Sequence, residues 1–429
     1  MKKGTKCTIC TGCGRCFGDE RAVPHIISYS GQDFSEGKAL NAPVICADIG
    51  TTTIAMICCD EQGHVIDSYV SLNPQGKYGA DVISRIRAAA DPSVLEDMKS
   101  AVTEVLKKGA SQFLSMLTNR SDEQPDESVT VCAMPGNEAE SVKMYISANT
   151  TMSYLLLGLD PSELGEAPFN ATHIDGAEFR INLPDSEAGS IGAVLLPGFS
   201  AFVGSDIYAG ILATHLCSSE KNRLLCDLGT NGEIALGNKE RLFVTATAAG
   251  PAFEGGPCKG VWGADMIHFA SVLLDEGVMD TTGLLADPYF DDGITIGSAT
   301  VTQESIRALQ LAKGAMRAGV KVLCDKAGIS YSDIDDCILA GGFGYYLDPT
   351  DAARIGLLPE ELIPVCKSGG NTSLAGALEY ALHIGGKSAD TGSGRMPGKN
   401  MLPPCTVINL AEESAFNDLY MNALNFEKI

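Results

Sequence analysis

Short apolar runs alternate with glycine-containing turns from residue 43 onward in this 429-residue chain. The segments 44–47, 54–59 and 65–70 are each predicted to be a β-strand, because short apolar runs bounded by turn residues are typical of strands. The first of these strands ends at Asp48, and a Gly-Thr-Thr turn follows it. The pattern therefore predicts a hairpin unit whose opening turn begins with a carboxylate.

The same order of elements returns in the second half of the chain. A strand is predicted to end at Asp227, where a Gly-Thr-Asn-Gly turn follows, and helical patterns succeed each hairpin unit, at 80–90 and 303–327. The predicted strands of the second copy are 223–226, 233–236 and 242–245. Two copies this far apart indicate duplication of a whole domain, because solenoid repeats have a much shorter period.

Changes of composition divide the chain into six predicted segments. A further strand at 338–340 runs into a glycine-rich turn, and a strand followed by an amphipathic helix is predicted near the C-terminus. The segments are a cysteine-rich head at 1–18, a linker at 19–42, a first lobe at 43–215, a second lobe at 216–385, a linker at 386–400 and a strand–helix tail at 401–429.

Charge and hydropathy narrow the function classes. The net charge of −23 argues against a nucleic-acid-binding protein, since phosphate backbones bind positive surfaces. The most apolar stretch, 191–203, is interrupted by Pro197 and Gly198, so no membrane span is expected. The N-terminal residues have no apolar signal region, and we expect a cytoplasmic protein. Its 15 cysteines are then expected to be thiols or metal ligands rather than disulfides.

The paired acidic strand ends predict an ATP site. Glycine lets the backbone approach a phosphate, and the N–H and hydroxyl groups that follow it donate hydrogen bonds to phosphate oxygens. Asp48 and Asp227 are predicted to hold Mg²⁺ through water, because Mg²⁺ retains several waters and takes few carboxylates. The predicted phosphate-binding residues are Gly50, Thr51, Thr52, Thr53, Gly229, Thr230, Asn231 and Gly232. The predicted adenosine-binding residues, in the glycine-rich turn after strand 338–340, are Gly341, Gly342 and Gly344.

Two further carboxylates are candidates for orienting the water that attacks ATP. Glu254 lies in the glycine-rich segment 249–256, and Asp206 follows the Val-Gly-Ser sequence at 203–205. Hydrolysis depends mostly on positioning and electrostatics, so either carboxylate could serve. The alternative for Asp206 is an N-cap of a helix, and the sequence leaves both open.

The N-terminal head contains four cysteines at regular spacing: Cys7, Cys10, Cys13 and Cys16. The first three match the spacing of bacterial-type [4Fe–4S] sites, so an iron–sulfur cluster is predicted. A structural zinc site is the alternative, although zinc sites usually divide their cysteines into two separated pairs. The fourth ligand stays open, since Cys366 or Cys405 could replace Cys16. The remaining cysteines lie mostly in apolar segments and are predicted to be core residues.

The two acidic hairpins and the glycine-rich turn resemble the phosphate and adenosine motifs of the superfamily of acetate and sugar kinases, heat-shock chaperones and actin. Within it, the chain resembles the ATP-dependent reductive activators of corrinoid proteins over about residues 43–384 and again in the tail up to Phe426. The segments that carry this narrower resemblance are 73–86, 196–199, 203–206, 248–256, 314–319 and 371–377. The resemblance implies an α/β fold of two duplicated actin-like, ribonuclease H-like ATPase domains.

The resemblance also implies an activity. Such activators use ATP to help return an oxidised Co(II) corrinoid to Co(I), and the electron passes through an iron–sulfur centre. The implied partners are a corrinoid protein of a methyltransferase system and a low-potential donor such as ferredoxin or flavodoxin, and a homodimer is compatible with the sequence. Well-known members carry a full ferredoxin-like domain, whereas the head here is too short for one. A small-molecule kinase and a zinc-headed nucleotide-binding scaffold are the alternatives.

Overall fold

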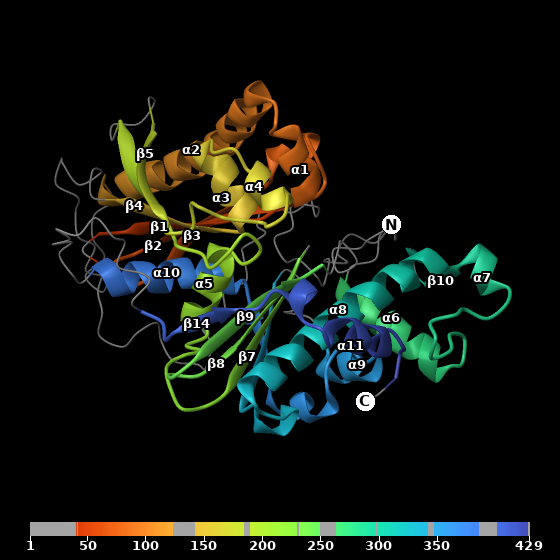
Figure 1. The fold of residues 1–429 in the computed structure, drawn as a ribbon. Helices are drawn as coiled ribbons and strands as arrows, with labels where there is room; N and C mark the ends of the chain where they lie inside the picture. Colours follow the sequence, from red (N-terminus) through yellow and green to blue (C-terminus); the bar gives the residue numbers. More distant parts are fainter. Residues whose placement is uncertain are drawn as a thin grey trace.

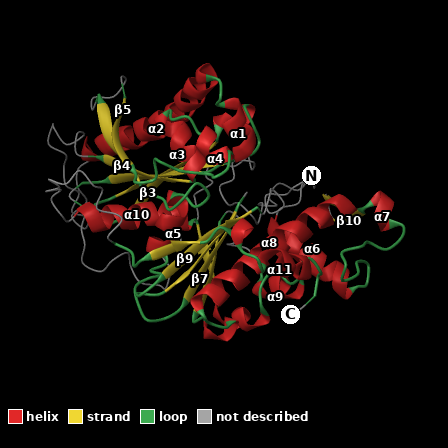
Figure 2. Cartoon of the chain, viewed as in Figure 1, coloured by secondary structure: helices red, strands yellow, loops and turns green. Residues whose placement is uncertain are grey.

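The structure is a computed structural model, and it describes residues 40, 42–122, 142–183, 189–229, 231–248, 263–296, 299–341, 347–385 and 401–427. These residues form two lobes, each built on a mixed β-sheet with helices on both faces (Figures 1 and 2). No helix in these ranges is long and apolar enough to cross a membrane.

The first lobe contains a six-stranded sheet in the order β3-β2-β1-β4-β6-β5. β1 pairs antiparallel with β2 and parallel with β4, and almost every residue of β1 is buried. Its strands are β1 (Val44–Ile49), β2 (Thr53–Cys59), β3 (Val65–Leu72), β4 (Lys143–Ala148), β5 (Ala177–Asn182) and β6 (Ser190–Leu195). Its helices are α1 (Val82–Ala88), α2 (Pro92–Asp122), α3 (Thr150–Leu157), α4 (Ser162–Gly165) and α5 (Ser205–Ala213).

The second lobe has the strand order β13-β12-β7-β8-β9-β14, in which the first five strands correspond to β6-β4-β1-β2-β3 of the first lobe and the sixth strand lies at the opposite edge. β7 pairs antiparallel with β8 and parallel with β12, as β1 does with β2 and β4. Its strands are β7 (Arg223–Leu228), β8 (Gly232–Gly237), β9 (Leu242–Thr247), β12 (Asp336–Ala340), β13 (Cys366–Gly370) and β14 (Cys405–Val407), and a hairpin forms from β10 (Ile294–Ile296) and β11 (Ala299–Val301). Its helices are α6 (Gly263–Asp275), α7 (Tyr289–Asp292), α8 (Gln303–Ala327), α9 (Pro349–Arg354) and α10 (Thr372–Gly385).

The longest helix of the second lobe shows why these residues are helical. α8 begins after a capping box, in which Thr302 and Ser305 satisfy each other's backbone N–H groups, and it ends at Gly328 in a left-handed conformation. Its bounds coincide with the predicted helix at 303–327. The duplicated actin-like fold is confirmed, because the paired hairpins open two sheets of equivalent topology.

Helices α5 and α10 lie between the two sheets. α10 belongs to the C-terminal half of the chain, yet it packs beneath β1 and β4 of the first sheet (Figure 1). Leu374, Leu378 and Tyr380 share one core cluster with Val44 and Ile57. The lobes are therefore joined through a buried helix pair and not only through a linker.

The C-terminal tail returns across the second lobe. β14 extends the sheet beside β9, and helix α11 (Phe416–Ala423) packs on α8. The buried Lys313 of α8 donates hydrogen bonds to the carbonyl groups of Ala423 and Asn425, at 2.7 and 2.6 Å. The predicted strand–helix order of the tail is confirmed. The predicted linkers at 19–42 and 386–400 fall almost entirely outside the described residues.

The cysteines outside the head lie mainly in the core, as predicted. Six of the described ones are buried: Cys46, Cys58, Cys59, Cys226, Cys324 and Cys337. The two cysteines considered as additional cluster ligands, Cys366 and Cys405, are only partly buried. They lie on β13 and β14, which are opposite edges of the second sheet.

Candidate functional site

The first predicted phosphate loop lies between β1 and β2. Asp48 occupies the end of β1, and the N–H of Gly50 donates to the carbonyl of Thr53 across a tight turn. Asn73 donates to the carbonyl of Gly50 at 2.8 Å, and the buried Arg85 donates to the carbonyl of Thr51 at 2.6 Å. The loop is thus held from behind by two side chains whose role the sequence did not reveal.

The hydroxyl of Thr51 forms a hydrogen bond within the chain. It accepts a hydrogen bond from Asn149 at 3.1 Å, and the Thr51 residue is only 5% exposed. The Oδ1 atom of the same asparagine caps α3 by accepting from Met152 N. The structure leaves Thr52 and Thr53 partly exposed. The threonines of the loop therefore differ in environment, although the sequence treats them alike.

The second predicted loop lies between β7 and β8, the counterparts of β1 and β2. Asp227 lies at the end of β7, directly across the ladder from Glu233 on β8. The N–H of Gly229 donates to the carbonyl of Asn231, and Gly232 begins β8 as a buried residue. Glu233 is 6% exposed and is a site residue that the sequence analysis missed. Its position was readable in principle, because the hairpin register places it opposite Asp227.

Gly341 closes this side of the site. It follows β12, which is parallel to β7, and its φ of +88° lies in the left-handed region. A Cβ atom at this position would stand 2.6 Å from the Oδ1 atom of Asp227 and 2.7 Å from the carbonyl of Leu228. Only glycine fits both the backbone conformation and the space.

Asp206 lies in the first turn of α5. Gly204 occupies the N-cap of this helix, so the alternative of Asp206 as the N-cap is wrong. The Gly204 position has no room for a side chain, since a Cβ there would stand 2.6 Å from the Cα of Asn149. A carboxylate in the first turn is favoured by the partial positive charge of the helix N-terminus. Asp206 therefore projects from the start of the helix that joins the lobes.

The candidate site contains interacting carboxyl groups from both lobes: Asp48, Asp206, Asp227 and Glu233. Burial and, to a smaller extent, the charge of Asp48 raise the pKa of Asp206 to about 7. Burial raises the pKa of Asp227 to about 7 as well, with contributions from Asp206 and Asp48. Burial and the charges of Asp206 and Asp227 raise the pKa of Glu233 well above its usual range. Such mutual repulsion is relieved when a cation binds among the carboxylates.

Asp48 has two partners from the far end of the second lobe. Asn371 donates to its Oδ2 atom at 3.0 Å, and Ser373 donates to its Oδ1 atom at 2.8 Å. These hydrogen bonds lower the pKa of Asp48, but burial is the larger effect and the net pKa is raised. Both residues lie in the segment 371–377, which carries part of the family resemblance but has no role that can be read from its sequence.

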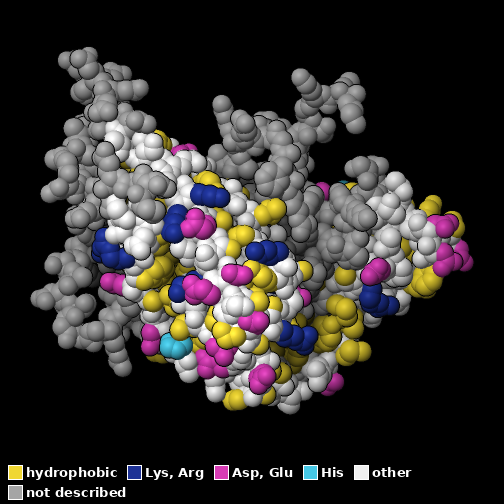
Figure 3. Space-filling model, turned by 90° about the horizontal axis from the view of Figure 1, so that it is seen from above, with side chains coloured by type: hydrophobic (Ala, Val, Ile, Leu, Met, Phe, Trp, Pro, Cys, Tyr) yellow, Lys and Arg dark blue, Asp and Glu magenta, His cyan; other side chains and the backbone are white. Residues whose placement is uncertain are grey.

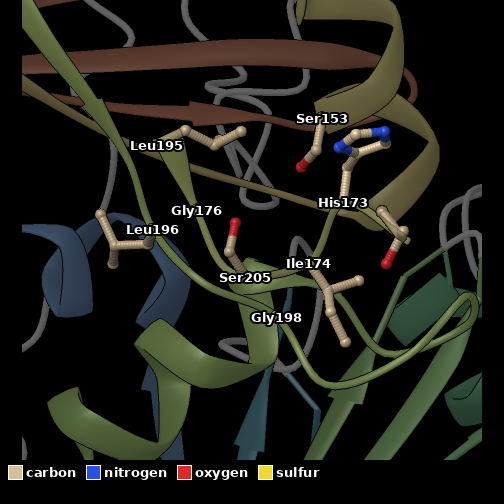
Figure 4. A pocket seen from close by; sticks show the side chains of 10 residues that line it. Ser153, His173, Ile174, Gly176, Leu195, Leu196, Gly198 and Ser205 are labelled. Carbon is tan, nitrogen blue, oxygen red and sulfur yellow. The ribbon is translucent and has the colours of Figure 1, made fainter. Parts of the chain in front are cut away.

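A small pocket opens beside the start of α5 (Figure 4). Ser153 and Ser205 line it together with His173. The Ser205 hydroxyl donates to the carbonyl of Ala148 and accepts from its N–H, so it braces the turn after β4.

On the face of the molecule seen in Figure 3, acidic and basic side chains of the described residues are interspersed.

Several predicted site residues lie outside the described part of the chain. They are the head cysteines Cys7, Cys10, Cys13 and Cys16, together with Thr230, Glu254, Gly342 and Gly344. The described site residues come from both hairpins, from the turn after β12 and from the start of α5. Within the described ranges, no group of three or more His, Cys, Asp or Glu side chains has metal-binding geometry.

Comparison with known proteins places the chain in a family. A family model described as the RACo middle region matches residues 44–219. A second, described as the C-terminal domain of RACo, the ASKHA domain, matches residues 221–264 and 257–429. Together these two models account for most of the chain.

Two curated relatives have names that refer to corrinoid proteins. The corrinoid activation enzyme RamQ of Eubacterium limosum is 30% identical, over 91% of this chain and 71% of that protein. The [Co(II) methylated amine-specific corrinoid protein] reductase of Methanosarcina barkeri is 26% identical, over 53% of this chain and 50% of that protein.

A solved reductive activator for a corrinoid, iron–sulfur protein is 26% identical and superposes with a TM-score of 0.72. That alignment covers 90% of this chain and 66% of the solved chain, so the present chain spans just under two thirds of the length of the solved protein. The chain belongs to the RACo family of corrinoid-protein activators, with an actin-like ATPase domain of the ASKHA type.

Proposed function

We propose that this chain binds ATP with Mg²⁺ between its lobes and uses ATP hydrolysis to help return a Co(II) corrinoid protein to Co(I). The observation that carries the proposal is the meeting of Asp48, Asp206 and Asp227 from both lobes, where the charge of Asp48 raises the pKa of the other two and that of Asp206 raises the pKa of Asp227. Membership of the RACo family supports the corrinoid partner, and the enzymes named above act on such proteins by their printed names.

The residues of the site fit a magnesium–nucleotide complex. Asp48 and Asp227 would hold the ion through water, and the glycines at 50 and 229 leave room for phosphate beside backbone N–H groups. Bound Mg²⁺ would neutralise charge that develops on the phosphate oxygens. Gly341 would give the adenosine access to the backbone beside Asp227. Binding between the lobes would then draw on groups from both.

The water that attacks the terminal phosphate needs a group to orient it. Asp206 is suited to this task, because a carboxylate that lies on the first turn of α5 and interacts with Asp48 and Asp227 can accept a proton from the water. Its place on the first turn of α5 also fixes its direction. Glu254 stays the second candidate.

The cysteine head would supply the electron route. We assign a [4Fe–4S] cluster to Cys7, Cys10 and Cys13, with Cys16 or another cysteine as fourth ligand, on the basis of their spacing. A cluster held by these cysteines would supply one-electron transfer chemistry between a low-potential donor, such as ferredoxin or flavodoxin, and Co(II), whose reduction to Co(I) takes up one electron. The carboxylates of the lobes would assist the conversion of ATP and water to ADP and phosphate.

The test combines metal content with activity. Protein purified without oxygen is analysed for iron, sulfide and zinc, and phosphate release from ATP is measured with and without Co(II) corrinoid protein. The proposal predicts about four irons and four sulfides per chain, lost on changing Cys7, Cys10 and Cys13 to Ser. It also predicts ATPase activity that Asp227→Asn reduces at least ~100-fold. Stoichiometric zinc would support the scaffold alternative, and a phosphorylated small molecule would support the kinase.

A further inference from the structure

The segment 371–377 consists of Asn371, which follows β13, and the first six residues of α10, and it contacts both Asp48 of β1 and helix α5. Its first residue, Asn371, accepts a hydrogen bond from Leu374 N through Oδ1, as a helix cap does. Its Nδ2 group donates in another direction, to the Oδ2 atom of Asp48 at 3.0 Å. One side chain thus begins α10 and holds a carboxylate of the other lobe.

Ser373 holds the second oxygen of the same carboxylate. Its hydroxyl lies 2.8 Å from the Oδ1 atom of Asp48 and 2.8 Å from the hydroxyl of Ser147. Ser147 lies on β4 directly beside Asp48 on β1, and it is fully buried. The contact between Ser373 and Asp48 is therefore fixed from both sides, within a network that water does not readily loosen.

The same segment also sets how closely α10 approaches α5. A Cβ atom on Gly376 would overlap the backbone carbonyl of Ala209 and stand 2.6 Å from the Cα of Ala209. Asp206 lies one turn earlier on α5. The helix that holds Asp48 is thus in backbone contact with the helix that carries the candidate water-orienting carboxylate.

We propose that Asn371 and Ser373 are positioning residues that fix the direction of the Asp48 carboxylate and join the magnesium–nucleotide site to the place of α10 between the lobes. The inference rests on the proposed ATPase function. Each carboxylate oxygen has two lone pairs, so Asp48 can keep both protein partners and still accept from a metal-bound water. Groups that orient a metal-binding side chain commonly change metal affinity when they are removed.

A simple capping role would not account for the second hydrogen bond of Asn371. The two roles use different atoms and can be separated by substitution. Asn371→Asp keeps the Oδ1 acceptor that caps α10 but places a carboxylate against Asp48. Ser373→Ala removes the other donor. Asn409→Asp is the matched control, because Asn409 caps a short 3₁₀ turn through its Oδ1 atom far along the chain from this site.

The experiment measures ATPase rate against Mg²⁺ concentration in the full-length protein, together with kcat, the KM for ATP and the urea midpoint. We expect Asn371→Asp and Ser373→Ala each to raise the half-saturating Mg²⁺ concentration at least ~10-fold, whereas Asn409→Asp should leave it unchanged. Adding Ser373→Ala to Asp48→Asn should have little further effect, since the two residues act through one contact.

Unchanged Mg²⁺ dependence in both variants would overturn the inference, and so would an equal loss in the Asn409→Asp control. Wild-type protein without ATPase activity would refute the proposed function instead. In that event the same variants are compared by the heat of Mg²⁺-ADP binding, and equal affinities there would also overturn the positioning role.

Discussion

The tight crossing of α5 and α10 allows a direct test of how the lobes are joined. Replacing Gly376 by Ala adds one methyl group where the backbone of Ala209 leaves no room. Contact with ordinary spacing begins at 3.4 Å, whereas the new Cβ would stand 2.6 Å from the Cα of Ala209 and closer still to its carbonyl. The two helices must therefore part by roughly 1 Å or more, because a backbone cannot rotate away as a flexible side chain can.

Two opposite effects decide the size of the change. Alanine favours a helix interior over glycine by about 1 kcal/mol, which would stabilise α10. Overpacking a buried contact costs about 1–3 kcal/mol, and a clash with backbone lies at the upper end. Parting the helices also loosens the cluster in which Leu378 packs against Tyr208 and Leu212. We expect a net loss of about 2 kcal/mol in the free energy of unfolding, together with a raised KM for ATP.

Urea denaturation followed by circular dichroism measures the first quantity, and steady-state phosphate release measures the second. Gly192→Ala is the control, because a Cβ on that strand residue comes no closer than 3.8 Å to another atom, the Cγ of Lys143. The control should match or slightly exceed wild-type stability. If Gly376→Ala were as stable as the control and kept the wild-type KM, the close crossing would not be what joins the lobes.

Three further predictions concern buried charges. Asp206→Asn should stabilise the nucleotide-free protein by about 1–2 kcal/mol at pH 8 but not at pH 4, while lowering kcat. The sign follows from a folded pKa raised from 3.8 to about 7, since the cost of ionisation appears as the pH rises through that interval. Lys313→Met should remove a pH dependence of the opposite sign, because burial lowers the pKa of Lys313 from 10.5 to about 7. The free energy of unfolding of the wild type, relative to that of the variant, should therefore rise between pH 7 and pH 10.5, by at most about 1.4 kcal/mol per pH unit. Urea midpoints across pH measure both, and parallel pH curves for variant and wild type would contradict them. Arg85→Met should cost about 3 kcal/mol and raise the KM for ATP, because the carbonyls of Gly79 and Thr51 lose a buried donor; an unchanged KM would show that the first loop keeps its shape without Arg85.

Local patterns predicted the elements of this fold well. The strands before Asp48 and Asp227 and the long helix at 303–327 are each marked by apolar runs, turns or caps that act over a few residues. The duplication was visible because the two hairpins keep the same order of residue types. These features placed both acidic strand ends in the candidate site before any contact was known.

The contacts that complete the site were not predictable in the same way. Asn371 and Asp48 are separated by 323 positions, and their hydrogen bond depends on a helix of one half lying beneath the sheet of the other. An arginine in a helix ordinarily extends into solvent, yet Arg85 is 1% exposed. Burial of a charge becomes favourable only when distant carbonyl groups are placed to accept from it, and periodicity carries no record of that.

The two halves are equivalent in topology but differ in what their aspartates contact. Asp48 accepts hydrogen bonds from Asn371 and Ser373 at the start of α10. Asp227 instead lies against the backbone of Gly341 and is paired with Glu233 across the hairpin. A change in the position of α10 would therefore move the partners of Asp48 and leave those of Asp227 in place. This difference between the partners of Asp48 and Asp227 matters in a protein proposed to couple ATP to a reaction on another protein. The first loop would respond to the arrangement of the lobes, while the second would provide the fixed part of the proposed phosphate site, and a ligand that needs both would favour one arrangement over others.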